Sequence, residues 1–146
     1  MANVKISQLT AKGSNIASSD RFAIAQDDGG GVFSSKYVLG SQIHNMSFNL
    51  KTVNYTLALD DSRKMIEVDS TSNRTITVPL NSAVAFPIGT KVMVSRLNTG
   101  TVKIAGSAGV TIHSAGGKYD LAAQYSVATL LKRDTDTWYL YGDLIV

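Results

Sequence analysis

The feature that most constrains this chain is the alternation of short apolar runs with turn residues through its last third, from Gly89 to Val146. Each run is only a few residues long, and Gly, Asn, Asp or Ser separates it from the next. Short, evenly spaced strands joined by tight turns are typical of an all-β sandwich or barrel. We therefore predict a mainly β protein in which this stretch is a meander of neighbouring strands.

The same pattern extends upstream into the middle of the chain. Between Val53 and Leu59, apolar side chains alternate with small or polar ones, which is the period of a strand. Another strand is predicted near residues 65–68, and a third ends or lies at a sheet edge at Pro79, because proline cannot donate to a ladder. Residues 51–146 are therefore predicted to form one C-terminal domain, a small antiparallel β-sandwich or barrel-like fold.

The first part of the chain, residues 1–50, has a different organisation. A polar arm comes first, and a β-hairpin is predicted over residues 21–36. Its turn contains Gly29-Gly30-Gly31, since glycine supplies the positive φ angles of tight turns. A short helix is predicted within residues 37–50, where apolar side chains have approximate helical spacing. Asn45–Asn49 is interpreted as the connector into the C-terminal domain.

Composition and charge limit the classes of partner. The chain has 146 residues, of which 17% are charged, and its net charge of +3 is not gathered into a basic cluster. Electrostatic binding of nucleic acid needs a concentrated basic patch, so we expect no nucleic-acid partner. No apolar run approaches the roughly 20 residues that cross a bilayer, and Met1–Ile6 does not open an apolar signal segment. We therefore expect no membrane insertion.

Catalytic motifs are not found in the sequence. Because the chain has no cysteine, disulfides, thiolate catalysis and cysteine-based zinc sites are excluded. The two histidines, His44 and His113, stand far apart and without local partners. Carboxylates are paired at Asp27-Asp28, Asp60-Asp61 and Asp134/Asp136, all in predicted turns, where aspartate is favoured for backbone reasons. We expect no enzymatic activity, no cofactor and no metal site.

The aromatic residues near the end of the chain leave two interpretations open. Trp138, Tyr139 and Tyr141 could form a platform that stacks against sugar rings, or they could belong to the core. In a strand, Tyr139 and Tyr141 share one face and Trp138 lies on the other. We favour the core, with this segment as the closing strand of the domain.

Two segments of the chain resemble structural proteins of tailed bacteriophages. The first is Ile6-Ser7-Gln8-Leu9-Thr10, followed by Ser19-Asp20-Arg21-Phe22-Ala23-Ile24 and the glycine turn. It is similar to the N-terminal unit of many tail-fibre, head-fibre and adaptor proteins. The second, from Tyr55 to Val146, resembles a small β-domain common at the ends of phage fibre chains. Its matching features include Thr75-Ile76-Thr77-Val78-Pro79, Phe86-Pro87-Ile88-Gly89-Thr90 and Trp138-Tyr139-Leu140-Tyr141-Gly142-Asp143.

The resemblance implies a virion protein, assembled in the host cytoplasm as a homotrimer and bound to other virion proteins of the capsid, neck or tail. Without a repetitive shaft it would be a short fibre, a decoration or an adaptor. We expect residues 1–50 to supply virion attachment and oligomerisation, and residues 51–146 to project outward. A partly ordered terminus is the other interpretation of the arm. The candidate partner-binding residues are apolar side chains of the first region: Val4, Ile6, Leu9, Phe22, Ile24 and Phe33.

Two other functions are kept as alternatives. A receptor- or glycan-binding tip would bind host surface polysaccharide and would expose aromatic side chains among Tyr119, Tyr125 and Tyr139. An enzyme acting on the cell envelope would need carboxylates that converge in a cleft, and the placement of the aspartate pairs in turns argues against it.

Overall fold

The computed structural model describes residues 21–27, 33–39 and 46–146 of the chain. Residue contacts divide the chain into two units, Met1–Asn45 and Met46–Val146. Strands dominate the described residues, with only two short 3₁₀ helices in the second unit, so the prediction of a mainly β protein is confirmed.

In the first unit, two strands pair over the residues where the sequence predicts a hairpin. Strand β1 (Arg21–Asp27) is antiparallel to β2 (Phe33–Leu39), with Arg21 opposite Leu39 and Asp27 opposite Phe33. The strand β2 continues beyond the predicted end of the hairpin and occupies the first residues of the predicted helix. The glycine turn lies outside the described residues.

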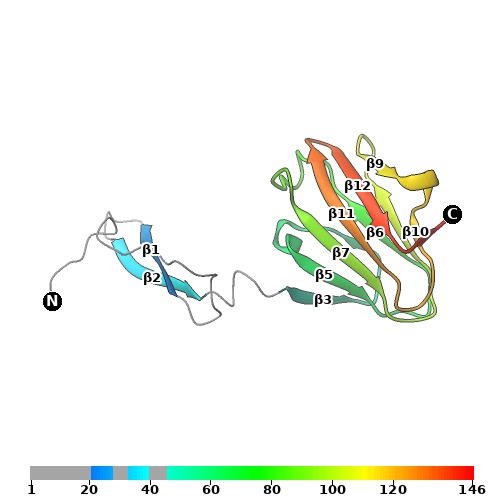
Figure 1. The fold of residues 1–146 in the computed structure, drawn as a ribbon, viewed down its shortest axis with the longest axis horizontal. Coiled ribbons are helices and arrows are strands. Elements are labelled where there is room, and N and C mark those ends of the chain that lie inside the picture. The colour runs from blue at the N-terminus through cyan, green and yellow to red at the C-terminus, as the bar shows by residue number, and fades with distance from the viewer. Residues whose placement is uncertain (1–20, 28–32, 40–45) are drawn as a thin grey trace, which may run out of the picture. The chain divides into compact units, whose positions relative to one another are not determined.

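The second unit is a sandwich of two mixed sheets (Figure 1). One sheet has six strands, in the order β3 (Ser47–Lys51), β5 (Lys64–Val68), β7 (Lys91–Arg96), β11 (Val127–Asp134), β12 (Thr137–Gly142) and β9 (Thr111–Ser114). The other has five, in the order β13 (Leu144–Ile145), β10 (Asp120–Leu121), β8 (Val102–Gly106), β6 (Arg74–Val78) and β4 (Tyr55–Thr56). The 3₁₀ helices are η2 (Leu59–Asp61) and η3 (Ala115–Gly117).

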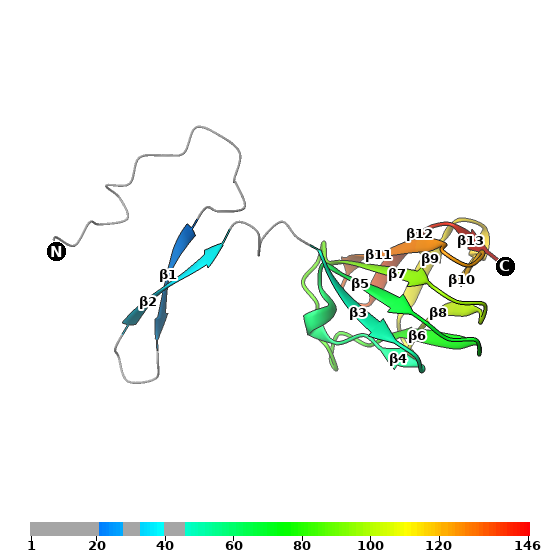
Figure 2. The ribbon, with the colours of Figure 1, turned by 90° about the horizontal axis from the view of Figure 1, so that it is seen from below.

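The chain does not meander along one sheet, as the sequence predicted, but passes from one sheet to the other. Strands β3, β5 and β7 stack in parallel in the six-stranded sheet, while β4, β6 and β8 stack in parallel in the other. Figure 2 shows the two layers, with β3 and β4 together at one end. The sheets are therefore mixed and not antiparallel. Apolar periodicity could not predict this, because a strand has the same pattern whichever strand lies beside it.

The later strands close the sandwich mainly with antiparallel pairs, although β9 pairs parallel with β12. Strands β11 and β12 form the last hairpin, with Leu130 opposite Leu140, and β11 also pairs antiparallel with β7. This hairpin is confirmed where the sequence predicted it. Strand β6 ends at Val78, immediately before Pro79, as the missing proline N–H requires.

Two predicted segments differ from the structure. The run from Val53 to Leu59 is not one strand: only Tyr55–Thr56 pairs, and Val53 and Leu59 are 59% and 53% exposed. The chain leaves the sheet after Thr56 because it turns into η2, so the alternation continues without a ladder. The predicted connector Asn45–Asn49 is likewise wrong at its end, since β3 begins at Ser47 and occupies the last residues of the predicted helix as strand.

The hydrophobic core lies between the two sheets. Its largest member is Trp138 of β12, whose ring meets that of Phe86 edge to face, with centroids 5.5 Å apart. Fully burying a side chain of this kind contributes roughly 1.5–3 kcal/mol. The other core residues are Leu57, Ile66, Val68, Ile76, Val78, Val92, Val94, Val102, Ile104, Leu121, Ala128, Leu130 and Leu140.

One glycine allows close contact between the turns that precede β6 and β8. Gly100, in the turn before β8, is buried against the turn at Ser70–Ser72, which precedes β6. A Cβ atom at residue 100 would lie 2.2 Å from the carbonyl oxygen of Ser72, closer than any real contact. Only glycine fits there, because the obstructing atoms belong to the backbone.

Candidate interaction surface

The outer face of the six-stranded sheet is the most unusual surface of the described domain. Residues such as Ile66, Val94 and Leu130 point inward, so their neighbours along each strand point outward. In register across the sheet, these outward side chains form three rows. We call this surface the six-strand outer face; its strands lie side by side in Figure 1.

The central row crosses five strands and consists of apolar and aromatic side chains, interrupted by one threonine. Phe48 of β3 pairs with Met65, Met65 with Met93, Met93 with Thr129, and Thr129 with Tyr141. The side chains at the two ends of the row are the most open, with Phe48 64% and Tyr141 49% exposed. An isolated exposed apolar residue is ordinary, but a contiguous row of them is typical of an interaction surface.

A second row lies beside the central one, toward the turn between β11 and β12. Leu131 pairs with Lys91 on one side and with Tyr139 on the other, and Tyr139 pairs with His113. The rings of His113 and Tyr139 have centroids 6.0 Å apart. Next to them Tyr141 lines a shallow hollow of about 460 Å³, together with Ser114, Ala115 and Leu140.

The third row lies on the opposite side of the central row. Leu50, which is 57% exposed, pairs with Glu67, Glu67 with Ser95, and Ser95 with Val127. Across all three rows, the charged side chains are therefore the carboxylate of Glu67 and the ammonium of Lys91. The other ionisable side chains are Tyr139, Tyr141 and His113. Both signs of charge are present at the margins of an apolar strip.

The outer face of the five-stranded sheet is different. Its outward residues are small and hydroxyl-bearing: Thr56 pairs with Thr77, and Thr77 with Ala105. In the neighbouring row Thr75 pairs with Lys103. This row continues from Lys103 to Asp120 and ends at Ile145, which is 44% exposed at the sheet edge. Ile145 is the one large apolar side chain in these two described rows, although the strands share the same core as the other sheet.

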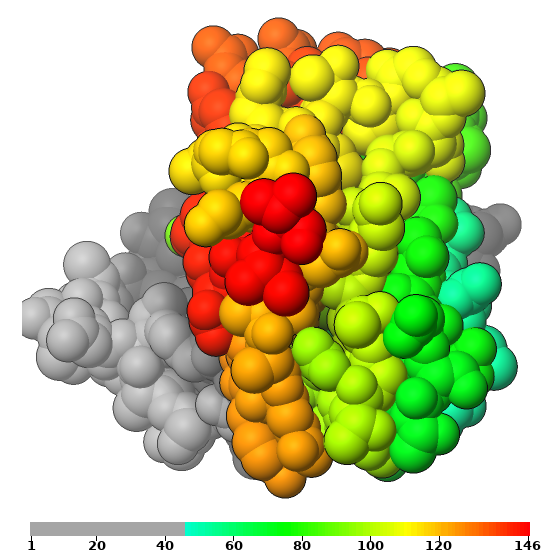
Figure 3. All heavy atoms as spheres, turned by 90° about the vertical axis from the view of Figure 1, so that its right-hand side faces the viewer, coloured from blue at the N-terminus to red at the C-terminus, as the bar shows by residue number. Residues whose placement is uncertain are grey.

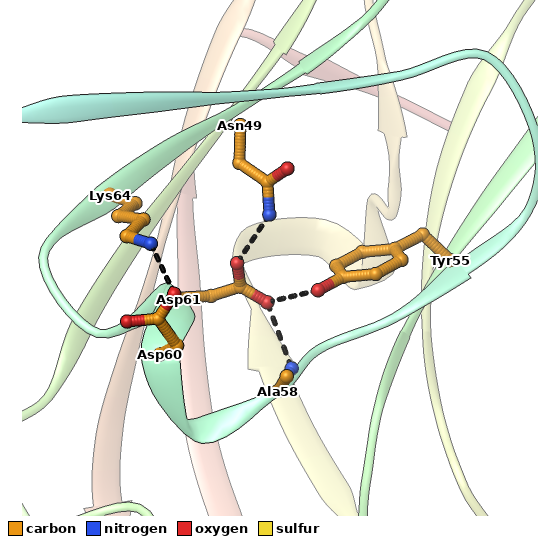
Figure 4. Close-up of polar contacts among 6 residues, drawn as sticks. All are labelled: Asn49, Tyr55, Ala58, Asp60, Asp61 and Lys64. Atoms are coloured by element: carbon orange, nitrogen blue, oxygen red, sulfur yellow. Dashed lines mark hydrogen bonds and ion pairs between the residues drawn. The ribbon is translucent and has the colours of Figure 1, made fainter.

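A buried carboxylate closes the end of the sandwich formed by β3 and β4 (Figure 4). Asp61 of η2 is 1% exposed and accepts hydrogen bonds from Asn49 Nδ2 at 2.7 Å, Tyr55 Oη at 2.8 Å and Ala58 N at 2.8 Å. Asn49 belongs to one sheet and Tyr55 to the other. Asp61 therefore joins the two sheets at their edge strands, β3 and β4, beyond which neither sheet has another strand.

The environment of this carboxylate also acts on the neighbouring phenol. Burial, together with the hydrogen bond to Asp61, raises the pKa of Tyr55 above its ordinary value of 10.0. The ammonium of Lys51 lies 3.9 Å from the centre of the Tyr55 ring. The two residues of the pair Asp60-Asp61 therefore have different roles. Asp61 is buried and structural, whereas Asp60 is exposed and forms an ion pair with Lys64.

A second buried charge holds the long loop before β7. Lys132 of β11 is 2% exposed, and its Nζ donates to the carbonyl oxygen of Phe86 at 2.8 Å and to Asn81 Oδ1. The same ammonium lies 5.9 Å from the centre of the Trp138 ring. In sequence Lys132 belongs to a Lys-Arg pair with no sign of burial, and its structural role was missed.

Half of the sequence-predicted anchor residues lie outside the described part of the chain, and half lie in β1 and β2. Val4, Ile6 and Leu9 lie outside the described residues. Phe22 and Ile24 are in β1 and Phe33 begins β2; in the register Phe22 stands opposite Val38 and Ile24 opposite Lys36.

The aromatic residues lie on opposite faces, as alternation along a strand predicts. The favoured core interpretation is confirmed for Trp138 and is wrong for Tyr139 and Tyr141, because only one face of β12 is turned to the core. Trp138 is buried, while Tyr139 and Tyr141 are 40% and 49% exposed on the six-strand outer face. Tyr125 is 73% exposed in a turn, with a positive φ of 68°. Tyr119 is half-buried, and its hydroxyl donates to the carbonyl of Ile112.

Phe48 and Leu50 were missed by the sequence interpretation. They alternate with Asn49 and Lys51, which is the period of a strand, whereas the sequence predicts the end of a helix and a connector over these residues. The C-terminal end of the chain is exposed as well: Figure 3 looks onto it, and Val146 is 88% exposed.

Within the described residues, no three His, Asp or Glu side chains gather where they could hold a metal ion. The described helices also include none of the length and hydropathy that a membrane crossing needs. No protein-family model matches the chain, and no curated protein matches it either.

Proposed function

We propose that this chain is a non-enzymatic structural subunit of a bacteriophage particle: a short fibre, a decoration or an adaptor. Residues 1–50 attach it to capsid, neck or tail proteins, and the assembled subunit is a homotrimer. The two sequence resemblances support the phage assignment. The observation that carries the structural role is the six-strand outer face, an apolar strip crossing five strands, because such surfaces are typical of protein contacts.

The described polar clusters support a structural role over a catalytic one. Asp61 accepts three hydrogen bonds that join the sheets, and Lys132 donates two hydrogen bonds that hold a loop. Both groups are buried and fully engaged within the fold, where they stabilise it. Neither is presented to a substrate.

Mass spectrometry of purified particles, together with the mass of the full chain in solution, tests the proposal. We expect the chain in intact particles and a mass of three copies in solution. Particles that lack the chain although infected cells contain it would contradict the virion assignment. A folded chain that stays monomeric at micromolar concentration would contradict the homotrimer.

A second candidate function is a tip that binds host surface polysaccharide. The observation that favours it is the shallow hollow lined by His113, Tyr139 and Tyr141, since aromatic faces stack on sugar rings. Calorimetric titration of the full chain with host polysaccharide tests it, with Tyr141→Ala as the variant and Thr77→Ala, on the outer face of the other sheet, as the control. Binding that is weakened at least tenfold by the first substitution only would favour this function; absence of heat with the wild type would remove it.

A further inference from the structure

We infer that copies of this chain pack against one another through the six-strand outer face. The inference rests on the self-association in the proposed function. It assigns a surface to that self-association, and the partner is another copy of this chain. Three observations carry it: the apolar rows, the dimensions of the face and the distribution of its charges.

The apolar rows call for an occupant. Phe48, Leu50 and Tyr141 are each about half exposed or more. Met65 and Met93 extend the strip between them in register, half-buried by their neighbours. Removing this strip from water is favourable by about 25 cal/mol per Å² of apolar area. The hydroxyl-rich face on the other sheet offers no comparable gain.

The dimensions of the face suit contact between copies of a domain. Six strands about 4.8 Å apart make it about 29 Å wide, and five residues at about 3.3 Å make it about 16 Å long. In a homotrimer, three such faces around a common axis would bring together roughly 1,400 Å² in projection, and more as accessible area, because the side chains stand out from the sheet. A specific interface needs about 1,000 Å² in total.

The charges on the face match those of a second copy. Glu67 lies in one marginal row and Lys91 in the other, on opposite sides of the central strip. Each copy therefore carries the counter-charge that the face of another copy requires. Beside the second row, Arg133 Nε donates to the hydroxyl of Tyr139 at 3.2 Å, and the guanidinium of Arg133 lies 3.6 Å from the carboxylate of Asp134, so this margin also carries both signs. A strongly acidic or basic partner would instead call for a concentration of the opposite charge on this surface.

A single introduced cysteine tests which molecule covers the face, because the natural chain has none. Leu50→Cys places a thiol on the six-strand outer face. Thr56→Cys is the matched control, an exposed residue of the edge strand β4 on the opposite outer face. The rate of thiol labelling is measured on both full-length variants over a range of protein concentrations.

The expected result is slower labelling of Leu50→Cys as the concentration rises, with no change for Thr56→Cys. When about 90% of the chains are assembled, the rate falls roughly tenfold, because only the free fraction reacts. Slow labelling at every concentration in a chain whose mass in solution is that of one copy would mean that another part of the same chain covers the face and would overturn the inference. Fast labelling at every concentration, or equal slowing at both sites, would also overturn it.

Charge substitutions separate this inference from the proposed function. Phe48→Glu with Tyr141→Glu should weaken self-association of the full chain at least tenfold, while Thr56→Glu leaves it unchanged. Circular dichroism confirms that each variant is folded, and the mass in solution gives the number of copies. An oligomer that resists the double substitution contradicts this inference and leaves the proposed function standing. A wild-type chain that is always monomeric contradicts both.

Discussion

The two sheets of the sandwich share one core but differ on their outer faces. On the five-stranded sheet, the outward rows are mostly small or polar, as at Thr75, Thr77 and Lys103, with Ile145 as the large apolar side chain at the edge. On the six-stranded sheet, the outward rows include large apolar side chains, with Phe48 and Tyr141 at the ends of the central row, and polar residues such as Thr129 interrupt them.

This difference shows which residues the fold requires and which it does not. Inward residues such as Ile66 and Ile104 are fixed by packing, because a void or a polar group between the sheets is costly. Outward residues are free of that constraint. Threonine suits a strand exposed to water, so the apolar outward residues of the six-stranded sheet point to a requirement beyond folding.

The largest expected effect separates the two faces of a single strand. Trp138→Ala should lower the free energy of unfolding by about 3–5 kcal/mol, because it empties the core between the sheets. Tyr139→Ala, one residue further along β12 and on the outer face, should cost far less. Urea unfolding of both variants under conditions where the chain is monomeric is the measurement, and equal losses would contradict the assignment of faces.

A smaller effect is expected where the two sheets are joined. Asp61→Asn should lower the free energy of unfolding by about 1–3 kcal/mol, because the amide offers one acceptor oxygen to three donors and turns its NH₂ toward one of them. Asp60→Asn is the control, since Asp60 makes only an exposed ion pair, a kind of contact that stabilises little. Equal effects on the urea midpoint would show that the buried carboxylate does not join the sheets.

A threonine can be placed on the six-strand outer face, so that it resembles the outer face of the five-stranded sheet. Phe48→Thr should change the intrinsic stability by less than about 0.5 kcal/mol, as expected for a surface position. It should also flatten the rise of Tm with protein concentration that accompanies self-association. Lys103→Thr, on the other sheet, is the control and should leave this rise intact. The measurement is differential scanning calorimetry at several protein concentrations. If Tm rises equally with concentration in both variants, the six-strand outer face is not the surface of self-association.

The smallest effect concerns pH. Burial and the hydrogen bond to Asp61 raise the pKa of Tyr55 above 10.0 in the folded chain, so the unfolded chain loses this proton first. The contribution of Tyr55 to stability is therefore fully present below pH 10 and is lost as the pH rises through the raised pKa. Urea unfolding between pH 9 and 11 should show a shallower decline for Tyr55→Phe than for the wild type. Tyr125→Phe, at an exposed site, should decline as the wild type does.

The candidate surface could be predicted only in part. Alternation along Thr137–Gly142 predicted that Trp138 and the two tyrosines point in opposite directions, and the structure confirms it. The row that joins Phe48 to Tyr141 could not be predicted, because it depends on pairings between strands far apart in the sequence. Asp61 gave no signal either: an aspartate in a turn has the same local sequence whether its carboxylate is buried or exposed.

The sequence by itself determined that the described chain is mainly β, where Pro79 ends a strand, and which residues form the last hairpin. These features follow from local chemistry: the period of two, the missing N–H of proline and the residues that tight turns require. Only the tertiary structure decided that the winding alternates between sheets, so that β3, β5 and β7 lie in parallel. The physical reason is that the partner of a strand is chosen by packing across the whole sandwich, and periodicity along one strand does not encode it.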